Sequence, residues 1–248
     1  MKFFYHIGKY LLLMRKIFRN PQRYSIYWKQ SLKEMISLGV GSLGIICIIS
    51  FFMGAVITIQ SGANMQDAWI PLYAIGYTVR QSVVLEFAST VMALILAGKV
   101  GSNIASEMGT MRTTEQIDAL EIMGINSASF LILPKIIGMI LMMPFLVIIS
   151  MFVSMVGGWL ASQATGIVSG YEYLYGLQYG FDSFGVTYAL IKSLFFAFVI
   201  TSIPAYHGYY VDVKGGALEV GAASTRAVVY TSIMILILNY VITQLLLI

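Results

Sequence analysis

A chain of 248 residues with 58% hydrophobic and 10% charged side chains is more apolar than a soluble domain, in which about half the residues are apolar and a quarter charged. This composition and a mean hydropathy of +0.83 exclude a soluble globular fold and predict an all-α integral membrane protein. The net charge of +4 comes from bases crowded at one end, which excludes a nucleic-acid-binding surface, and a single cysteine, Cys47, excludes a disulfide framework or a cysteine-ligated metal site.

Residues 1–33 combine basic and apolar side chains in a helical pattern. Every charged residue before Glu34 is basic, and apolar residues recur between the bases at helical spacing. The bases are Lys2, Lys9, Arg15, Lys16, Arg19, Arg23, Lys29 and Lys33, and the apolar residues are Phe3, Phe4, Ile7, Tyr10, Leu11, Met14 and Phe18. The pattern predicts a helix lying in the membrane interface, a break at Asn20-Pro21 and a cytoplasmic N-terminus. A solvated basic tail is the alternative interpretation.

Five apolar stretches are long enough to cross a bilayer and predict one domain over residues 1–248. The predicted spans are 36–60, 81–104, 133–159, 183–206 and 227–247. With the N-terminus inside, residues 63–80, which include Asp67 and Trp69, form an external loop or short surface helix, and the C-terminus is external. The bases Lys99, Arg112, Lys135, Lys214 and Arg226 are then cytoplasmic, in agreement with the positive-inside rule.

A polar, glycine-bearing stretch over residues 97–120 interrupts this apolar sequence between the second and third spans. Thr113 followed by Gln116 has the spacing of a capping box, and Gly124 is a stop signal, so we predict a helix over residues 113–123. Its apolar face would hold Ile117, Leu120 and Met123, and its acidic face Glu115, Asp118 and Glu121. From composition alone, this helix is either a simple connector or a docking element.

The sequence of this stretch resembles the signature of the MlaE family, the permease subunits of bacterial lipid-transporting ABC systems. That signature is A-G-R-x-G, followed by A-E-x-G-x-M-R-x-T-E-Q-x-D-A-L. The matching residues are Ala97, Gly98, Lys99, Gly101, Glu107, Gly109, Met111, Arg112, Thr114, Glu115, Gln116, Asp118, Ala119 and Leu120. Lys99 stands in place of an arginine and Ser106 in place of an alanine. The resemblance implies that residues 113–123 are the coupling helix that seats in a groove of an ATPase, and that the coupling residues are Glu107, Arg112, Thr114, Glu115, Gln116, Asp118 and Leu120. It also implies an interfacial elbow helix before the first span.

Two ionisable residues, Glu86 and Lys192, lie within apolar runs. An ionised group in the bilayer core costs a few kcal/mol, so these groups should face a cavity, the protein interior or one another. We predict that both lie within roughly 9–14 Å of the external surface. Two interpretations fit: a fixed ion pair that holds spans together, or a lipid path in which Lys192 meets a phosphate and Glu86 sets the local field.

The MlaE resemblance favours the lipid path. Glu86 matches the glutamate of an R-E-L-G-P segment in that family, where Leu85 stands in place of the arginine, and Lys192 matches a lysine. Asn239 stands where the family often has an aspartate in the last span. The candidate walls for acyl tails are Phe51, Phe52, Met53 and Ile57 in the first span. For each of these side chains, packing against a neighbouring helix or against lipid is the alternative.

The sequence lacks a phosphate-binding P-loop, a nucleophile–base arrangement and a histidine cluster, so we predict a non-catalytic subunit without a cofactor or metal. The resemblance implies the permease of an ABC transporter in a bacterial inner membrane that moves phospholipid between inner and outer membranes. It implies a homodimer, a separate ATPase that binds ATP and Mg²⁺, and a periplasmic MCE-domain ring protein, and leaves a STAS-like cytoplasmic subunit open. A secondary transporter or channel, or a non-transporting membrane scaffold, is the alternative.

Overall fold

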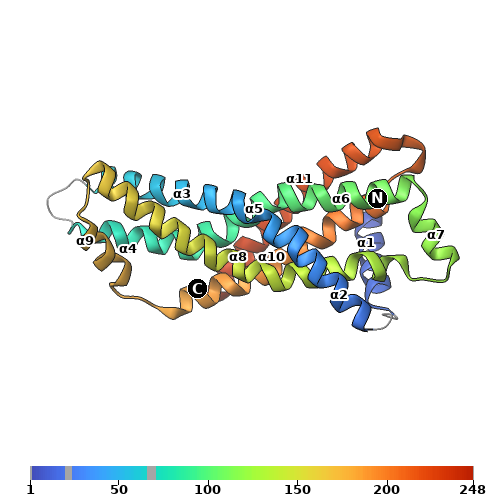
Figure 1. Ribbon diagram of the computed structural model, residues 1–248, viewed down its shortest axis with the longest axis horizontal. Coiled ribbons are helices and arrows are strands. Elements are labelled where there is room, and N and C mark those ends of the chain that lie inside the picture. Colours follow the sequence, from blue (N-terminus) through green and yellow to red (C-terminus); the bar gives the residue numbers. More distant parts are fainter. Residues whose placement is uncertain (1, 20–23, 66–70, 248) are drawn as a thin grey trace. The chain divides into compact units, whose positions relative to one another are not determined.

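The computed structural model describes residues 2–19, 24–65 and 71–247, and this part of the chain is helical and contains no strand (Figure 1). The predicted features that lie outside the described residues are the break at Asn20-Pro21, the base Arg23 and the external residues Asp67 and Trp69. The side chains of Lys2 and Phe3 are likewise outside the description. An all-α fold is confirmed.

Among the described residues, five helical segments are long and apolar enough to cross a membrane, as predicted. They are Tyr27–Asn64, Tyr73–Thr113, Ser127–Thr165, Ser183–Tyr209 and Val213–Leu247. Each includes its predicted span and is longer, because a bilayer core needs only about 20 helical residues and the helices continue beyond that length. Within the predicted external segment 63–80, α4 (Tyr73–Ser82) begins a helix that leads directly into the second span, and the external location of the segment stays a prediction.

The first two span-length segments are interrupted by tighter or wider helical turns. In the first, α2 (Tyr24–Glu34) is followed by a π-helical η1 (Met35–Gly39), a 3₁₀ turn η2 (Val40–Ser42) and α3 (Leu43–Asn64). In the second, π-helical η3 (Val83–Val91), α5 (Met92–Leu96) and π-helical η4 (Ala97–Gly101) separate α4 from α6 (Ser102–Thr113). Such π turns are frequent at functional sites, and η3 carries Glu86.

The chain divides into two compact units. Unit 1 comprises residues 1–41, 93–142 and 195–244, and unit 2 comprises residues 42–92, 143–194 and 245–248. The long helices α8 (Ser127–Thr165), α10 (Ser183–Tyr209) and α11 (Gly216–Leu247) each supply residues to both units. The single domain expected over residues 1–248 stays a prediction.

In unit 1, the N-terminal helix α1 (Lys2–Phe18) has one apolar face packed into the protein and another exposed. Leu13, Met14 and Ile17 are buried, whereas the exposed apolar side chains are Phe4, Ile7, Leu11, Leu12 and Phe18. The hydroxyl of Tyr10 donates to Ser202 Oγ at 2.8 Å, which fastens the helix to α10. The N-terminal segment is thus a docked helix rather than a solvated tail, and its second face suits the membrane interface.

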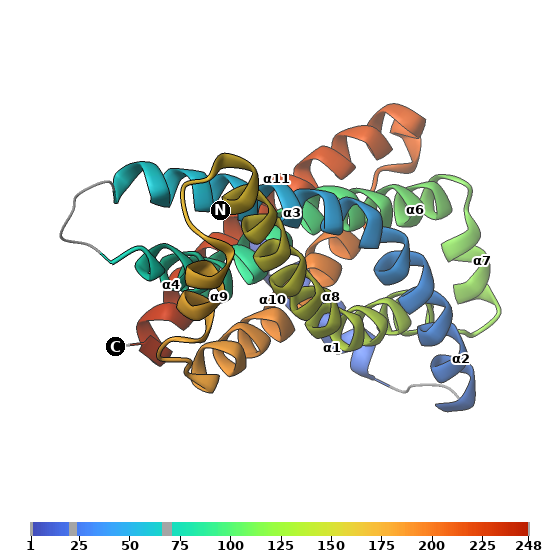
Figure 2. The same ribbon diagram turned by 60° about the vertical axis from the view of Figure 1, so that its left-hand side comes forward.

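In unit 2, two pairs of glycines allow helix backbones to approach closely. A Cβ atom added at Gly54 of α3 would lie 1.8 Å from the carbonyl oxygen of Ser154 of α8, and one at Gly157 would lie 2.2 Å from that of Phe51. Gly76 of α4 and Gly176 of α9 (Gly170–Gln178) make a similar pair. Figures 1 and 2 show α4 and α9 side by side. Small residues at these crossings permit the close packing on which membrane helices depend.

We expect Gly54→Ala to lower the stability of the purified chain by about 1–3 kcal/mol, because the new methyl group would force α3 away from α8. Gly44→Ala, on the same helix, is the matched control, since a Cβ there meets nothing within 4 Å. The measurement is the midpoint temperature for loss of monodisperse protein in detergent. Equal midpoints for the two variants would contradict close α3–α8 packing.

Candidate functional site

The polar segment between the second and third spans contains a short helix, α7 (Gln116–Ile122), within unit 1. The predicted capping box is wrong, because Thr113 is the last residue of α6 and its hydroxyl donates to the Thr110 carbonyl at 3.1 Å. The Thr114 hydroxyl donates to the same carbonyl at 2.8 Å. Glu115 then adopts a left-handed conformation with φ of 59°, which turns the chain into α7. The hydroxyls therefore close α6 rather than open α7.

The end of α7 agrees with the predicted stop at Gly124. This glycine has φ of 75°, and its N–H donates to the Glu121 carbonyl at 3.0 Å. The N–H of Ile125 donates to the Leu120 carbonyl at 3.0 Å, which completes a Schellman motif. The helix is therefore firmly terminated but runs over residues 116–122 instead of 113–123.

The apolar side chains of α7 divide between the protein interior and the surface. Ile117 is buried and Leu120 is partly buried, but Ile122 is 88% exposed and Met123 is also exposed. Met123 leaves the predicted apolar face because it lies beyond the last helical residue. Helical periodicity did not predict that Ile122 and Met123 are exposed together. The sequence signal for this exposed pair was two consecutive apolar residues just before the stop glycine, Gly124.

The predicted coupling residues fall into an exposed group and an anchored group. Thr114, Glu115 and Gln116 are exposed at the start of α7. Arg112 of α6 forms an ion pair with Asp118 of α7, which fixes the turn between the two helices. The exposed polar side chains therefore lie on a turn that the Arg112–Asp118 ion pair stabilises.

Glu107 forms an ion pair within unit 1, and its side chain remains 40% exposed. Lys135 of α8, which is buried, donates to Glu107 Oε2 at 2.8 Å and to Glu34 Oε1 at 2.9 Å. One lysine therefore joins α2, α6 and α8. Burying its charge is tolerable because two carboxylates surround it.

A second polar network ties α1 to the end of α7. Glu121 Oε1 accepts hydrogen bonds from Lys16 at 2.7 Å, from the Ser127 hydroxyl at 2.8 Å and from the Tyr209 hydroxyl at 2.8 Å. The bond from Lys16 and those from the two hydroxyls lower the pKa of Glu121 to about 2, although burial opposes the shift. Burial lowers the pKa of Lys16, but its bonds to Glu121 and Tyr209 outweigh that effect, so the pKa is raised. Sequence reasoning missed this network because its members lie far apart in the chain.

We expect Glu121→Gln to reduce stability by an amount that depends on pH. A lowered carboxyl pKa contributes stability that is present above the ordinary value of 4.5 and is lost as the pH falls toward about 2. The raised pKa of Lys16 keeps the ion pair intact up to at least its ordinary value of 10.5. The difference in thermal midpoint between the variant and the unchanged protein should be constant from pH 5 to 8 and shrink below pH 4. A difference that grows on acidification would contradict the network.

The predicted intramembrane charges meet in unit 2. Lys192 Nζ of α10 lies 3.1 Å from Glu86 Oε1 of η3, and it also donates to the Leu85 carbonyl at 3.2 Å and to the Tyr188 hydroxyl at 3.1 Å. Thr90 donates to Glu86 Oε2 at 3.0 Å. The lysine side chain is 0% exposed and the glutamate side chain 40% exposed. Glu86, rather than Lys192, is therefore the member of the pair that a ligand could reach.

The remaining predicted path residues have different environments. Phe52 is exposed, Phe51 and Met53 are partly buried, and Asn239 on α11 in unit 1 is partly buried. Ile57 is buried in an apolar core of unit 2 together with Ile75, Val79, Val147 and Tyr173. Its packing in this core favours the alternative interpretation, and its place on a lipid-path wall stays a prediction.

The chain is similar in sequence to known permeases. A family model described as Permease MlaE matches residues 31–245. A probable ABC transporter permease protein of Rickettsia bellii is 35% identical over 246 residues, covering 96% of this chain and 91% of the relative. The intermembrane phospholipid transport system permease protein MlaE of Haemophilus influenzae is 31% identical over 212 residues, covering 85% and 80%. The chloroplastic protein TRIGALACTOSYLDIACYLGLYCEROL 1 of Arabidopsis thaliana is 30% identical over 219 residues, covering 88% and 62%.

Proposed function

The chain belongs to the MlaE permease family, and we propose that it is the membrane subunit of a transporter that moves phospholipid between the inner and outer membranes of a bacterium. The name of the Haemophilus relative, an intermembrane phospholipid transport system permease, supports this substrate. The observation that carries the proposal is the terminated helix α7, whose end exposes Ile122 and Met123 between the second and third spans. Exposed apolar side chains on a rigid, polar turn suit docking to a protein groove.

The proposed occupant of that helix is a separate ATPase, which would bind ATP and Mg²⁺ and supply the energy. Ile122 and Met123 would enter its groove, and Thr114, Glu115 and Gln116 would form the polar rim. Arg112 and Asp118 would keep the turn rigid, so that a push on α7 reaches α6. The permease itself would be non-catalytic.

The proposed assembly is a homodimer in the inner membrane with a periplasmic MCE-domain ring protein, and a STAS-like subunit is an optional addition. A cytoplasmic N-terminus and five spans would put α7 in the cytoplasm and the C-terminus in the periplasm. The exposed apolar face of α1 would lie in the cytoplasmic interface, where Lys9 and Arg15 can meet anionic lipids.

The proposed lipid path passes the reachable carboxylate of Glu86. The exposed Phe52 and the partly buried Phe51 and Met53 would meet acyl tails, and Asn239 would add a polar group. Lys192 is buried and would not contact the lipid directly; it would fix the position of the Glu86 carboxylate and keep it charged.

The test is purification through a tag on this chain from its native host, followed by reconstitution into liposomes. We expect a P-loop ATPase to co-purify and ATP to increase lipid transfer to acceptor liposomes. A secondary transporter or channel would purify without a nucleotide-hydrolysing partner and would not respond to ATP. A scaffold would bind partners but transfer no lipid under either condition.

A further inference from the structure

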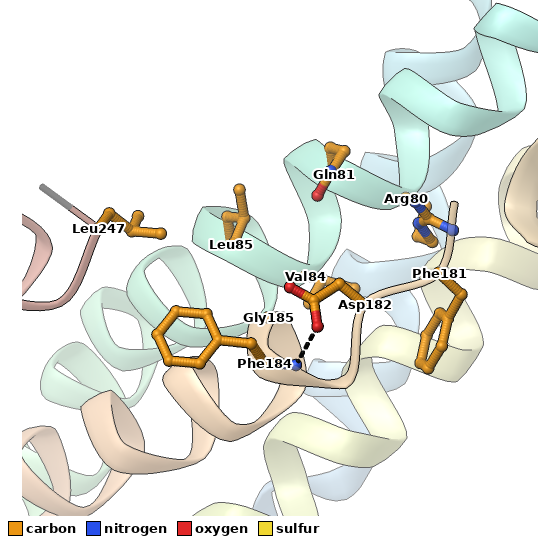
Figure 3. Close-up of a pocket in the computed structure, with 9 residues that line it drawn as sticks. All are labelled: Arg80, Gln81, Val84, Leu85, Phe181, Asp182, Phe184, Gly185 and Leu247. Carbon is orange, nitrogen blue, oxygen red and sulfur yellow. Dashed lines mark hydrogen bonds between the residues drawn. The ribbon is translucent and has the colours of Figure 1, made fainter. Parts of the chain in front are cut away.

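Unit 2 contains an open pocket of about 140 Å³ that neither the α7 surface nor the Glu86–Lys192 pair uses (Figure 3). Its walls come from the run of helix through α4 and η3, from the start of α10 and from the last described residue of α11. The lining residues on which its chemistry depends are Gln81, Val84, Leu85, Asp182, Phe184 and Leu247. One water needs only about 10–15 Å³ of such space, so the pocket can admit a small organic group.

The pocket is amphipathic along the helices that form it. Asp182 directly precedes α10, and Leu247 is the last residue of α11, so the opening lies at the ends of two span-length helices. Moving into the second span, Gln81 is followed by the apolar Val84 and Leu85. Span ends are the level at which lipid head groups meet their acyl chains. A lipid bound here would meet polar groups first and apolar walls further in.

The polar atoms directed into the pocket are hydrogen-bond acceptors. Asp182 Oδ1 accepts from the Phe184 N–H at 2.9 Å, and no lysine or arginine nitrogen of the described chain forms an ion pair with this carboxylate. The side-chain N–H of Gln81 donates to the Tyr77 hydroxyl at 3.1 Å, which leaves the amide oxygen for the pocket. Figure 3 shows this oxygen and the Asp182 carboxylate directed toward the same space. Asp182 is exposed, and a carboxylate beside a second acceptor favours a cationic donor.

The nearby cations are engaged elsewhere. Arg80 also lines the pocket, but its guanidinium donates to the Leu177 carbonyl at 2.7 Å and to the Gly180 carbonyl at 3.1 Å. Figure 3 shows the guanidinium on the Phe181 side, away from Leu247. Lys192 is held by Glu86 and by the carbonyl of the pocket residue Leu85. The negative charge of Asp182 is therefore available to a ligand.

We propose that this pocket binds the primary ammonium head group of an amine-bearing phospholipid, an inference that rests on the proposed lipid-transport function. The ammonium group has three donors, of which two would bond to Asp182 and to the amide oxygen of Gln81. The adjoining glycerol and acyl carbons would lie on Leu85, Phe184 and Leu247. A lipid with an anionic, amine-free head group would be repelled by the Asp182 carboxylate, while the Arg80 guanidinium, which also lines the pocket, is held by the Leu177 and Gly180 carbonyls.

The pocket lies one residue from the proposed path. Leu85 forms its wall, and the next residue, Glu86, is the half-exposed carboxylate of the intramembrane pair. The pocket wall and the Glu86 carboxylate therefore belong to consecutive residues of η3.

The test measures lipid selectivity of the assembled complex with spin-labelled phosphatidylethanolamine and phosphatidylglycerol. We expect the intact protein to prefer the amine-bearing lipid, and Asp182→Asn to lower that preference about two- to fivefold, the range for a solvent-accessible ion pair. The asparagine can still accept the Phe184 N–H, so α10 should start normally. Glu172→Gln is the matched control, since it removes an exposed acidic charge from α9 outside the pocket. An unchanged preference in Asp182→Asn would overturn the proposal.

A photoreactive benzoyl-phenylalanine at position 184 locates the bound species. We expect adducts with phosphatidylethanolamine that diminish in Asp182→Asn. Equal adducts with both lipids, or cross-links to a protein partner in their place, would overturn the inference. The outcome is separable from that of the proposed function: a complex that fails to move lipid but loses selectivity in Asp182→Asn keeps the pocket, and normal ATP-driven transfer with unaltered selectivity keeps only the transporter.

Discussion

Glu86→Met is expected to destabilise the permease more than Lys192→Met, although both variants break the same ion pair. The lysine is fully buried, so loss of Glu86 leaves its charge with only the Leu85 carbonyl and the Tyr188 hydroxyl as partners and no opposite charge. Removing one member of a buried pair in this way costs about 3–5 kcal/mol. The glutamate side chain is 40% exposed, so water can compensate it when Lys192 is replaced. That loss should resemble the ~1 kcal/mol or less of an accessible pair.

The double variant separates the two interpretations of the pair. Replacing both residues with methionine removes both charges and fills similar volume, so stability should return close to that of the unchanged protein. If the pair only holds η3 against α10, lipid transfer should return as well. If Glu86 serves the lipid path, transfer should remain low in the stable double variant. Thermal midpoints and ATP-driven transfer in liposomes measure the two effects, and equal destabilisation by the single variants would contradict the difference in burial.

The sequence predicted the features that depend on local composition or on a large energetic penalty. Span-length apolar runs show that the chain must satisfy its backbone inside a bilayer, and Gly124 marks a residue at which a left-handed conformation ends a helix. Glu86 and Lys192 could be expected to meet because each is costly alone in an apolar segment.

The missed features depend on partners that are distant in the chain or on the rotation of a helix. Lys135 has carboxylate neighbours from α2 and α6, and no local pattern relates it to Glu34. The segment α3 is apolar on every side, so periodicity could not show that Ile57 faces the core while Phe52 is exposed. Thr113 had the spacing of a capping residue, but that spacing alone does not distinguish the start of one helix from the end of the helix before it.

Ile122→Asp is expected to weaken ATPase binding at least tenfold and to reduce ATP-driven lipid transfer in proportion. The side chain is 88% exposed and lies at the end of α7, so a carboxylate there should leave the fold of the permease unchanged. In the groove of a partner, the same carboxylate would be desolvated in place of an apolar anchor, which costs about 2 kcal/mol or more at an interface centre. Leu120 is a poorer choice, because its partial burial would mix loss of folding with loss of docking.

The control for this experiment is Tyr171→Asp, which introduces the same charge at an 80% exposed aromatic residue of α9 in unit 2. Both variants should keep the thermal midpoint of the unchanged protein, but only Ile122→Asp should lose the ATPase during purification. The Schellman motif and the Arg112–Asp118 pair hold α7 in place without Ile122, so the loss would report on the contact itself. If Ile122→Asp retained the ATPase fully and transferred lipid normally, the exposed end of α7 would be ruled out as the docking surface. Transfer lost with the ATPase still bound would instead place Ile122 in the transmission of force through α6.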